Sequence, residues 1–296
     1  MEISVVIPTY NRKDTLEHVL PTLARQTYPA GDYEILLCDS GSTDGTLELV
    51  EKMAIPNLRM LIGDNLGRSG ARNRGIRESR GQLICFTDAD ILADPRLLEE
   101  HARIHLMEPK VAVVGCEVQV DSIEEYQEVV EHPKKGRHLH RRARKTLSWL
   151  FFLTGNASVP KKVLLDVGCF DGGFREYGHE DLDLGYRLAK SGVPLRYHPA
   201  ARNYHWHPLS FEERCKKMRQ SGTATVRLHA KHRDPFIKLR LGINPVSLAL
   251  HALLSGNSRI LRLCRNKTSS SRLCREIVLQ YSYLTGCKAA LKGTQA

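Results

Sequence analysis

The sequence predicts an α/β fold, a mixed and mostly parallel sheet flanked by helices, with a helical extension at the C-terminus. The first hundred residues alternate short apolar runs with stretches that carry leucine and valine at helical spacing. This alternation is typical of a parallel sheet with right-handed crossovers. From residue 211 onward the pattern is helical, with breaks at proline and at glycine or serine clusters. We therefore expect an α/β domain over residues 1–210 and a basic helical extension over residues 211–296.

The expected strands are short, continuous apolar runs. Residues 3–7 are rich in β-branched side chains and end at Pro8, as expected for a strand buried on both faces. Ligands of such sheets bind at the carboxyl ends of the strands, where this chain carries polar residues. The other expected strands are residues 33–38, 58–62, 83–86, 111–114 and 195–197, and the expected helices are residues 13–26, 71–79 and 96–107, with another from residue 43 or 44.

Composition indicates a globular protein of one large domain plus an appendage, with 296 residues, 42% of them hydrophobic and 26% charged. The first apolar run lacks a basic flank and is only strand length, so it does not predict a signal peptide. No stretch approaches the roughly 20 apolar residues of a membrane-spanning helix. The eight cysteines include no Cys-x-x-Cys pair, which argues against a zinc ribbon. We expect a cytoplasmic chain with reduced cysteines.

Positive charge is concentrated in two segments of this chain of net charge +11. Residues 134–145 hold seven Lys or Arg and no acid, and residues 236–296 hold ten against the single Glu276. Such segments favour binding to an anionic membrane surface, here at the inner face of the membrane, or to a substrate that bears phosphate. The alternatives are a solvated loop for the first segment, and for the second a helical cap on the α/β domain or on a second copy in a homodimer.

Two carboxylates one residue apart, Asp88 and Asp90, follow the expected strand 83–86. Hard oxygen ligands of this kind suit Mg²⁺ or Mn²⁺, which neutralise a diphosphate leaving group. The alternative is that these aspartates cap the helix that begins near Pro95, but Asp94 can provide that N-cap. After the second strand, Asp39 is expected to accept a hydrogen bond from a nucleotide base, and the alternative there is turn chemistry.

Seven motifs occur in a fixed order along the chain. They are residues 4–12 (SVVIPTYNR), 39–46 (DSGSTDGT), Asn65 with residues 70–75 (GARNRG), residues 87–90 (TDAD), residues 154–156 (TGN), residues 168–171 (GCFD) with Phe174, and residues 180–181 (ED). In this order they resemble the family 2 glycosyltransferases with the GT-A fold. The similarity covers about residues 1–210 and says little about the sugar moved.

The resemblance implies a UDP-, GDP- or dTDP-sugar donor and an inverting single displacement. Asp88 and Asp90 are expected to serve ribose and metal, with Asp90 the more direct ligand, and His205 rather than His207 is expected to complete the metal site. Base, ribose and diphosphate are expected to contact Pro8, Thr9, Tyr10, Arg12, Asp39, Arg72 and Asn156.

The acidic pair Glu180 and Asp181 is implied as catalytic, with Asp181 as the general base that deprotonates the acceptor hydroxyl. Independently, Asp181 opens an expected helix after a glycine-rich loop, where the helix dipole favours a carboxylate. The alternative is that Glu180, Asp181 and Asp183 only cap that helix.

Other functional classes fit less well. A nucleic-acid partner is not expected, because the strand ends are rich in carboxylates and no binding module is recognisable. No Gly-x-Gly-x-x-Gly follows a strand, which excludes a Rossmann dehydrogenase. A sugar nucleotidyltransferase or a sugar-nucleotide-binding protein of similar fold is the alternative. The acceptor is expected to be a lipid-linked or cell-envelope glycan.

Overall fold

The computed structural model describes residues 1–65, 67–133, 137–138, 146–174, 178–206, 210–254 and 259–293. Its contacts divide the chain into two units. The first unit holds the described residues up to 174 together with residues 180–206. The second unit holds the described residues from 210 onward and also Gly178 and His179. The expected division into residues 1–210 and 211–296 stays a prediction. Nothing in the sequence indicated that Gly178 and His179 group with the helical unit.

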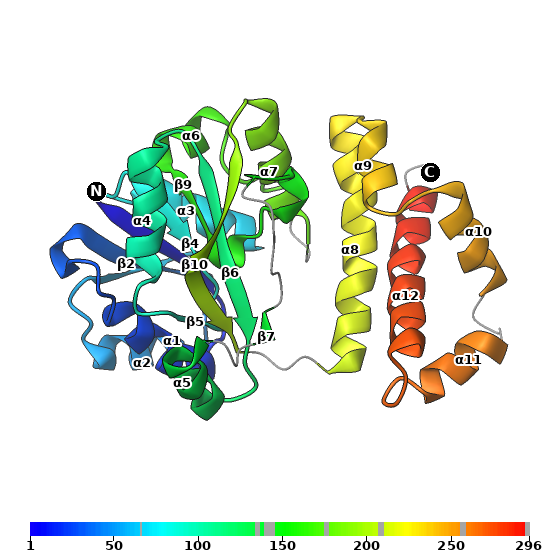
Figure 1. Cartoon of the computed structure of the whole chain (residues 1–296), viewed down its shortest axis with the longest axis horizontal. Coiled ribbons are helices and arrows are strands. Elements are labelled where there is room, and N and C mark those ends of the chain that lie inside the picture. The colour runs from blue at the N-terminus through cyan, green and yellow to red at the C-terminus, as the bar shows by residue number, and fades with distance from the viewer. Residues whose placement is uncertain are drawn as a thin grey trace. The chain divides into compact units, whose positions relative to one another are not determined.

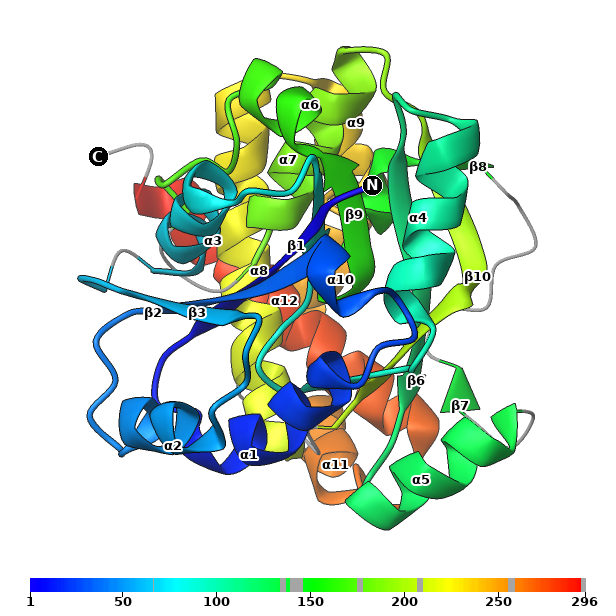
Figure 2. The ribbon, with the colours of Figure 1, turned by 90° about the vertical axis from the view of Figure 1, so that its left-hand side faces the viewer.

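The first unit is built on one mixed sheet with the strand order β3-β2-β1-β4-β9-β6-β10-β5. Figure 2 labels β3, β2, β1, β9, β6 and β10 of this sheet. β9 and β5 run antiparallel to their neighbours, and the other strands of this path are parallel to one another. Two short strands, β7 and β8, pair with β6 and β10. The strands are β1 (Ile3–Thr9), β2 (Tyr33–Asp39), β3 (Leu58–Ile62), β4 (Leu83–Phe86), β5 (Ile91–Ala93), β6 (Ala112–Gln119), β7 (Arg137–His138), β8 (Thr146–Leu147), β9 (Ala157–Pro160) and β10 (Leu195–His205).

Helices cover both faces of this sheet, with two apolar cores between the layers. Successive residues of β1 point to opposite faces, so Val5 and Ile7 join the core under α1 and α4, and Val6 joins the core under α3, α6 and α7. The helices are α1 (Lys13–Ala24), α2 (Thr46–Met53), α3 (Gly67–Glu78), α4 (Leu97–Met107), α5 (Ile123–Glu131), α6 (Lys161–Asp166) and α7 (Glu180–Lys190), with the 3₁₀ turns η1 (Ala30–Asp32), η3 (Trp149–Phe151) and η4 (Thr154–Asn156).

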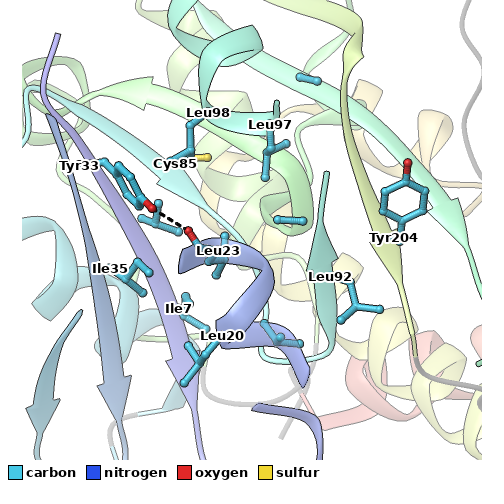
Figure 3. Packing of buried hydrophobic residues seen from close by; sticks show 14 of the residues in the cluster. Ile7, Leu20, Leu23, Tyr33, Ile35, Cys85, Leu92, Leu97, Leu98 and Tyr204 are labelled. Atoms are coloured by element: carbon cyan, nitrogen blue, oxygen red, sulfur yellow. Dashed lines mark hydrogen bonds between the residues drawn. The ribbon is translucent and has the colours of Figure 1, made fainter. Parts of the chain in front are cut away.

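Figure 3 shows part of the first core, where the α1 side chains Leu20 and Leu23 lie against Ile7 and Ile35 of the sheet. Tyr33 places its ring in the same core, and its hydroxyl donates to the Leu23 carbonyl oxygen over 3.0 Å. A buried hydroxyl needs such a partner, because an unpaired one costs about 1–3 kcal/mol.

The mixed, mostly parallel sheet is confirmed, and β3 and β4 have the expected bounds. α2 begins slightly later than expected, at Thr46, whose backbone N–H donates to the Asp44 carboxylate. β5 and β9 were not expected, because each is only three or four residues long and takes its hydrogen bonds from distant strands. β10 is longer than expected, because it continues past a bulge between His198 and Arg202.

The second unit is helical, and its two long helices α8 and α12 lie side by side (Figure 1). Glycines bring them together: a β-carbon at Gly222 would lie 2.0 Å from the Tyr283 carbonyl oxygen, and one at Gly286 would lie 1.9 Å from that of Arg219. Within the described residues, no helix is both long and apolar enough to cross a bilayer. The helices are α8 (Phe211–His232), α9 (Pro235–Arg240), α10 (Pro245–Leu253), α11 (Arg259–Asn266) and α12 (Arg272–Gly293).

Candidate active site

Asp88, Asp90 and His205 are brought together by the sheet. The segment between β4 and β5 carries the two aspartates, and β5 pairs with the end of β10, where His205 lies opposite Ile91. The Asp90 carbonyl oxygen also accepts a hydrogen bond from the Trp206 N–H over 3.0 Å. As a result, His205 Nε2 lies 3.9 Å from Asp90 Oδ1.

Arg72 of α3 lies between the two acidic motifs. Its side chain is 1% exposed, and its guanidinium donates to Asp88 Oδ1 over 2.7 Å and to Glu180 Oε1 over 3.2 Å. The sequence predicts a donor contact for Arg72, which stays a prediction, and the observed contacts are with protein carboxylates. Arg72 therefore joins the end of β4 to the start of α7.

The local charges and burial shift the pKa values of Asp88 and Asp181 in opposite directions. Burial acts to raise the pKa of Asp88, but the cations of Arg72 and Arg68 outweigh it and lower that pKa below its usual value. For Asp181, burial, followed by the neighbouring Glu180, raises the pKa to about 7. Asp181 Oδ1 also accepts a hydrogen bond from the Leu182 N–H over 2.8 Å. A carboxyl with a pKa near neutrality is suited to accept a proton at physiological pH.

Glu117 of β6 is a site residue that the sequence prediction missed. Burial raises the pKa of its carboxyl to about 7, and Asp88, Asp90 and Asp181 each add to that shift. Among the described residues the carboxyl has no hydrogen-bond or ion-pair partner. The one signal in the sequence is an acid within an otherwise apolar strand. In such a strand a charged side chain is costly unless a ligand or ion pairs with it.

The ends of β1 and β2 lie side by side, with Thr9 paired to Asp39 in the register. Asp39 Oδ1 accepts from the N–H groups of Gly41 and Ser42, and Oδ2 accepts from the Ser42 hydroxyl. These three bonds are turn chemistry, and they leave one lone pair of Oδ2 for another donor. The Thr9 hydroxyl is buried and has no hydrogen-bond partner among the described residues.

The turn after β1 presents the remaining residues expected around the nucleotide. Tyr10 is 49% exposed, and Pro8 and Arg12 are half-buried. The Asn11 N–H donates to the Ser42 hydroxyl over 2.8 Å, which ties this turn to the one after β2. These residues are thus on the same edge of the sheet as Asp88 and Asp90.

Asn156 has its amide directed into the protein. Its Nδ2 donates to the carbonyl oxygens of Cys116 and Ala201, and its Oδ1 lies 2.8 Å from His101 Nε2. Its side chain is buried, and all its strong bonds are internal. The geometry shows Asn156 holding η4 beside β6, and a direct donor contact stays a prediction.

The side chains here fit a divalent metal ion whose coordination shell is completed by a bound ligand. Carboxylate and imidazole suit Mn²⁺, and Mg²⁺ is commonly bound by one or two carboxylates plus substrate phosphates. Asp90 and His205 would hold such an ion, with Gln119 Oε1 3.4 Å from His205 Nδ1 to orient the ring. In the described part of the chain, no three His, Cys, Asp or Glu residues are grouped to hold an ion alone. His207 and most of the basic segment 134–145 lie outside the described residues.

We expect Glu117→Gln to stabilise the metal-free protein at high pH only. Because the pKa of Glu117 is raised in the folded state, its stability penalty is absent below about pH 4, grows as pH rises, and is complete above about pH 7. In EDTA, the unfolding temperature of the variant should match wild type near pH 4 and exceed it by several degrees near pH 8. The exposed Glu51→Gln is the control, and an equal gain at both pH values would contradict the assignment.

Comparison with known proteins identifies the family of the chain. The family described as "Glycosyl transferase family 2" matches residues 4–180, more than half of the chain. The uncharacterized glycosyltransferase YfnE of Bacillus subtilis is 31% identical over 245 residues, which cover 66% of this chain and 62% of that protein. Validoxylamine A glucosyltransferase of Streptomyces hygroscopicus subsp. jinggangensis is 33% identical over 223 residues, 65% of this chain and 52% of that protein. The chain thus spans about half to three fifths of the length of these relatives.

Solved structures share the fold. A mannosyltransferase from Pyrobaculum calidifontis, in complex with GDP-Man and Mn²⁺, superposes with a TM-score of 0.67 at 21% identity and covers 98% of this chain and 87% of its own. Residues 1–349 of TarS from S. aureus, in complex with UDP, superpose with a TM-score of 0.57 at 17% identity and cover 99% and 92%. The sheet is therefore that of a GT-A-like fold, and the chain belongs to glycosyl transferase family 2, whose enzymes invert configuration at the transferred sugar.

Proposed function

We propose that this protein transfers a sugar from a nucleotide-sugar donor to an acceptor hydroxyl with inversion, by a metal-assisted single displacement. The observation that carries the proposal is the cluster in which Arg72 joins Asp88 to Glu180, beside Asp90, Glu117 and Asp181. One cluster thereby holds candidate metal ligands and a carboxyl that accepts protons near neutral pH. These are the two groups that an inverting transfer requires.

The donor lies along the strand ends in this proposal. The turns after β1 and β2 receive the base and ribose. There, among the described residues, the Thr9 hydroxyl has no partner and Asp39 keeps one free lone pair. Asp90 and His205 hold Mg²⁺ or Mn²⁺, which when bound neutralises charge on the diphosphate leaving group. The structural neighbours named above were solved with GDP-Man and Mn²⁺ and with UDP, and another TarS structure contains UDP-GlcNAc. These ligands support a nucleoside diphosphate sugar here.

Asp181 acts as the general base. Its carboxylate removes the proton of the acceptor hydroxyl while that oxygen attacks the anomeric carbon from the side opposite the diphosphate, which inverts the configuration. Glu180 is held by Arg72 and is therefore placed to orient the start of α7 rather than to move a proton. Arg72 keeps Asp88 ionised and in place, and Asn156 bonds the backbone of β6 and β10 from within the protein.

A polymeric or lipid-linked glycan of the cell envelope is the acceptor class we propose. Relatives of similar sequence include chondroitin synthase of Escherichia coli, 26% identical over 241 residues. They also include a poly(ribitol-phosphate) N-acetylglucosaminyltransferase, TarS of Staphylococcus aureus, 33% identical over 105 residues. The second name describes a polymer that bears phosphate, and the basic segments of this chain would complement such an acceptor or an anionic membrane surface.

The helical unit supports a peripheral membrane location. In α11, Leu261 and Cys264 are buried in the unit, whereas Ile260 and Leu263 are 59% and 60% exposed. At 100° per residue these four side chains form one continuous apolar face of the helix. Only half of that face is therefore covered by the protein.

Basic residues complete the amphipathic pattern of α11. Arg259, Arg262 and Arg265 occupy the rest of the helix circumference. α9 repeats the combination, with Phe236 and Leu239 exposed one turn apart next to Lys238 and Arg240. Exposed apolar side chains flanked by arginine and lysine are the pattern of helices that lie in the interface of an anionic bilayer. An anionic lipid surface is thus the partner we propose for this face.

We expect Asp181→Asn to lower transfer by about 10²–10⁴-fold, because a positioned general base contributes that much. Binding of nucleoside diphosphate with Mn²⁺ should be unchanged, since the base does not hold the donor. The variant should be at least as stable as wild type near pH 8, because it removes a carboxyl whose pKa is raised by burial. Product formation and calorimetric nucleotide binding measure the two effects. Transfer near the wild-type rate would refute the role of Asp181.

For the membrane proposal, we expect the protein to sediment with phosphatidylcholine vesicles that contain phosphatidylglycerol, and to be released by salt. Leu263→Glu should weaken the partition about tenfold or more, because it removes the burial of one leucine. Leu106→Glu changes a leucine of similar exposure on α4 and is the matched control. No sedimentation at low salt would contradict the proposal, as would a wild-type partition for Leu263→Glu. Dimerisation that Leu263→Glu abolishes would instead assign this face to a second copy.

A further inference from the structure

The backbone that leads into α7 is held in an unusual conformation. Gly178 and His179 both have positive φ, 110° and 70°. Glycine adopts this region without penalty, but a residue with a β-carbon is strained there and persists only where its surroundings hold it. The next two residues are Glu180 and Asp181, so the direction of this turn sets the direction in which both acidic side chains leave the backbone.

The side chain of His179 provides the hold, and its partners belong to the helical unit. The imidazole is buried, and its Nε2 lies 2.6 Å from the Thr225 hydroxyl of α8. Thr225 is fully buried and donates its own proton to the Ser221 carbonyl oxygen over 3.1 Å. Its oxygen is therefore an acceptor for His179 Nε2–H.

A second hydrogen bond fixes the position of Thr225. The Tyr283 hydroxyl of α12 lies 2.9 Å from the Thr225 oxygen and 2.7 Å from the Leu241 carbonyl oxygen. The Leu241 carbonyl oxygen can only accept, so it takes the Tyr283 proton, and the Thr225 proton is shared between the Ser221 carbonyl oxygen and the Tyr283 oxygen. The Thr225 oxygen therefore stays the acceptor for His179. Burial lowers the pKa of His179 to about 4, so the imidazole is neutral at physiological pH and can keep its proton on Nε2. The network is complete without any ligand.

We infer that His179 is a positioning residue: its hydrogen bond to Thr225 holds the left-handed turn that aims Asp181 at the acceptor hydroxyl. The inference rests on the proposed role of Asp181 as base. It gives the helical unit a part in catalysis, because α8 and α12 hold the residue that precedes the catalytic pair. A helical unit that served only to bind a membrane would have no need of a buried hydrogen-bond network ending at this turn.

Substitutions at His179 separate the hydrogen bond from the backbone strain. His179→Ala removes the bond and keeps a β-carbon in the left-handed region. His179→Gly also removes the bond but relieves the strain, so it should fold at least as well as the alanine variant. His179→Gln places an amide N–H at a similar reach and should restore the bond. His251→Ala is the matched control, because His251 Nε2 makes the same kind of bond to the Thr285 hydroxyl, over 3.1 Å, within the helical unit.

The readouts are nucleoside diphosphate release from UDP-GlcNAc and GDP-mannose with Mn²⁺, calorimetric binding of UDP and GDP, and the unfolding temperature. We expect His179→Ala and His179→Gly to lower kcat about a hundredfold, as a displacement of about 1 Å does, with nucleotide affinity within about twofold of wild type. His179→Gln should recover most of the rate. His251→Ala should keep the wild-type kcat even where it lowers the unfolding temperature.

Thr225 gives a second test that does not alter the turn itself. Thr225→Ser keeps the hydroxyl and should keep the wild-type kcat. The isosteric Thr225→Val lacks the hydroxyl and should lower kcat as the His179 variants do. Wild-type kcat in His179→Gly or in Thr225→Val would overturn the inference, and so would an equal loss in His251→Ala. Failure of the proposed function is distinct, because wild type would then release no nucleoside diphosphate, or Asp181→Asn would release it at the wild-type rate.

Discussion

The two ion pairs of the buried Arg72 guanidinium, with Asp88 and with Glu180, hold the elements of the candidate site together. The two acidic residues are far apart in sequence, and the guanidinium is fully enclosed. Removing one partner of such a group leaves an uncompensated buried charge, at a cost of about 3–5 kcal/mol. Arg72 thus fixes the end of β4 relative to the start of α7. The same cation keeps Asp88 ionised, while Asp181, further from it, has a pKa raised to about 7. Arg72 thereby helps to keep Asp88 ionised, whereas Asp181 can take up a proton near neutral pH.

The sequence predicted much of the fold because the strands of a buried parallel sheet are continuous apolar runs. The same alternation placed Thr9, Asp39, Asp88 and Asp90 at strand ends, and the sheet register shows Thr9 opposite Asp39. The antiparallel strands β5 and β9 escaped prediction because their short segments are defined by partners distant in sequence. These strands matter to the site, since β5 is what brings His205 to Asp90.

Side-chain roles were less predictable than positions. A motif indicates that an arginine or asparagine belongs to the site but not which way its polar group points. Arg72 and Asn156 are predicted to contact the donor, which stays a prediction, and in the structure their polar groups bond protein partners. Glu117 gave almost no sequence signal, because its importance comes from three carboxylates that other elements bring near it. His179 is similar, since its partner Thr225 lies 46 residues further along the chain.

We propose that Asp90 and the strand-end turns together bind a metal–nucleoside diphosphate. Thermal unfolding of wild type and Asp90→Asn, with UDP, GDP and dTDP in Mn²⁺ or in EDTA, measures this binding. Ligands that bind only the folded state raise its unfolding temperature. We expect one nucleotide to stabilise wild type strongly with Mn²⁺ and weakly in EDTA, and we expect Asp90→Asn to show only the weak effect. Equal stabilisation in Mn²⁺ and EDTA, or in the variant and wild type, would contradict it.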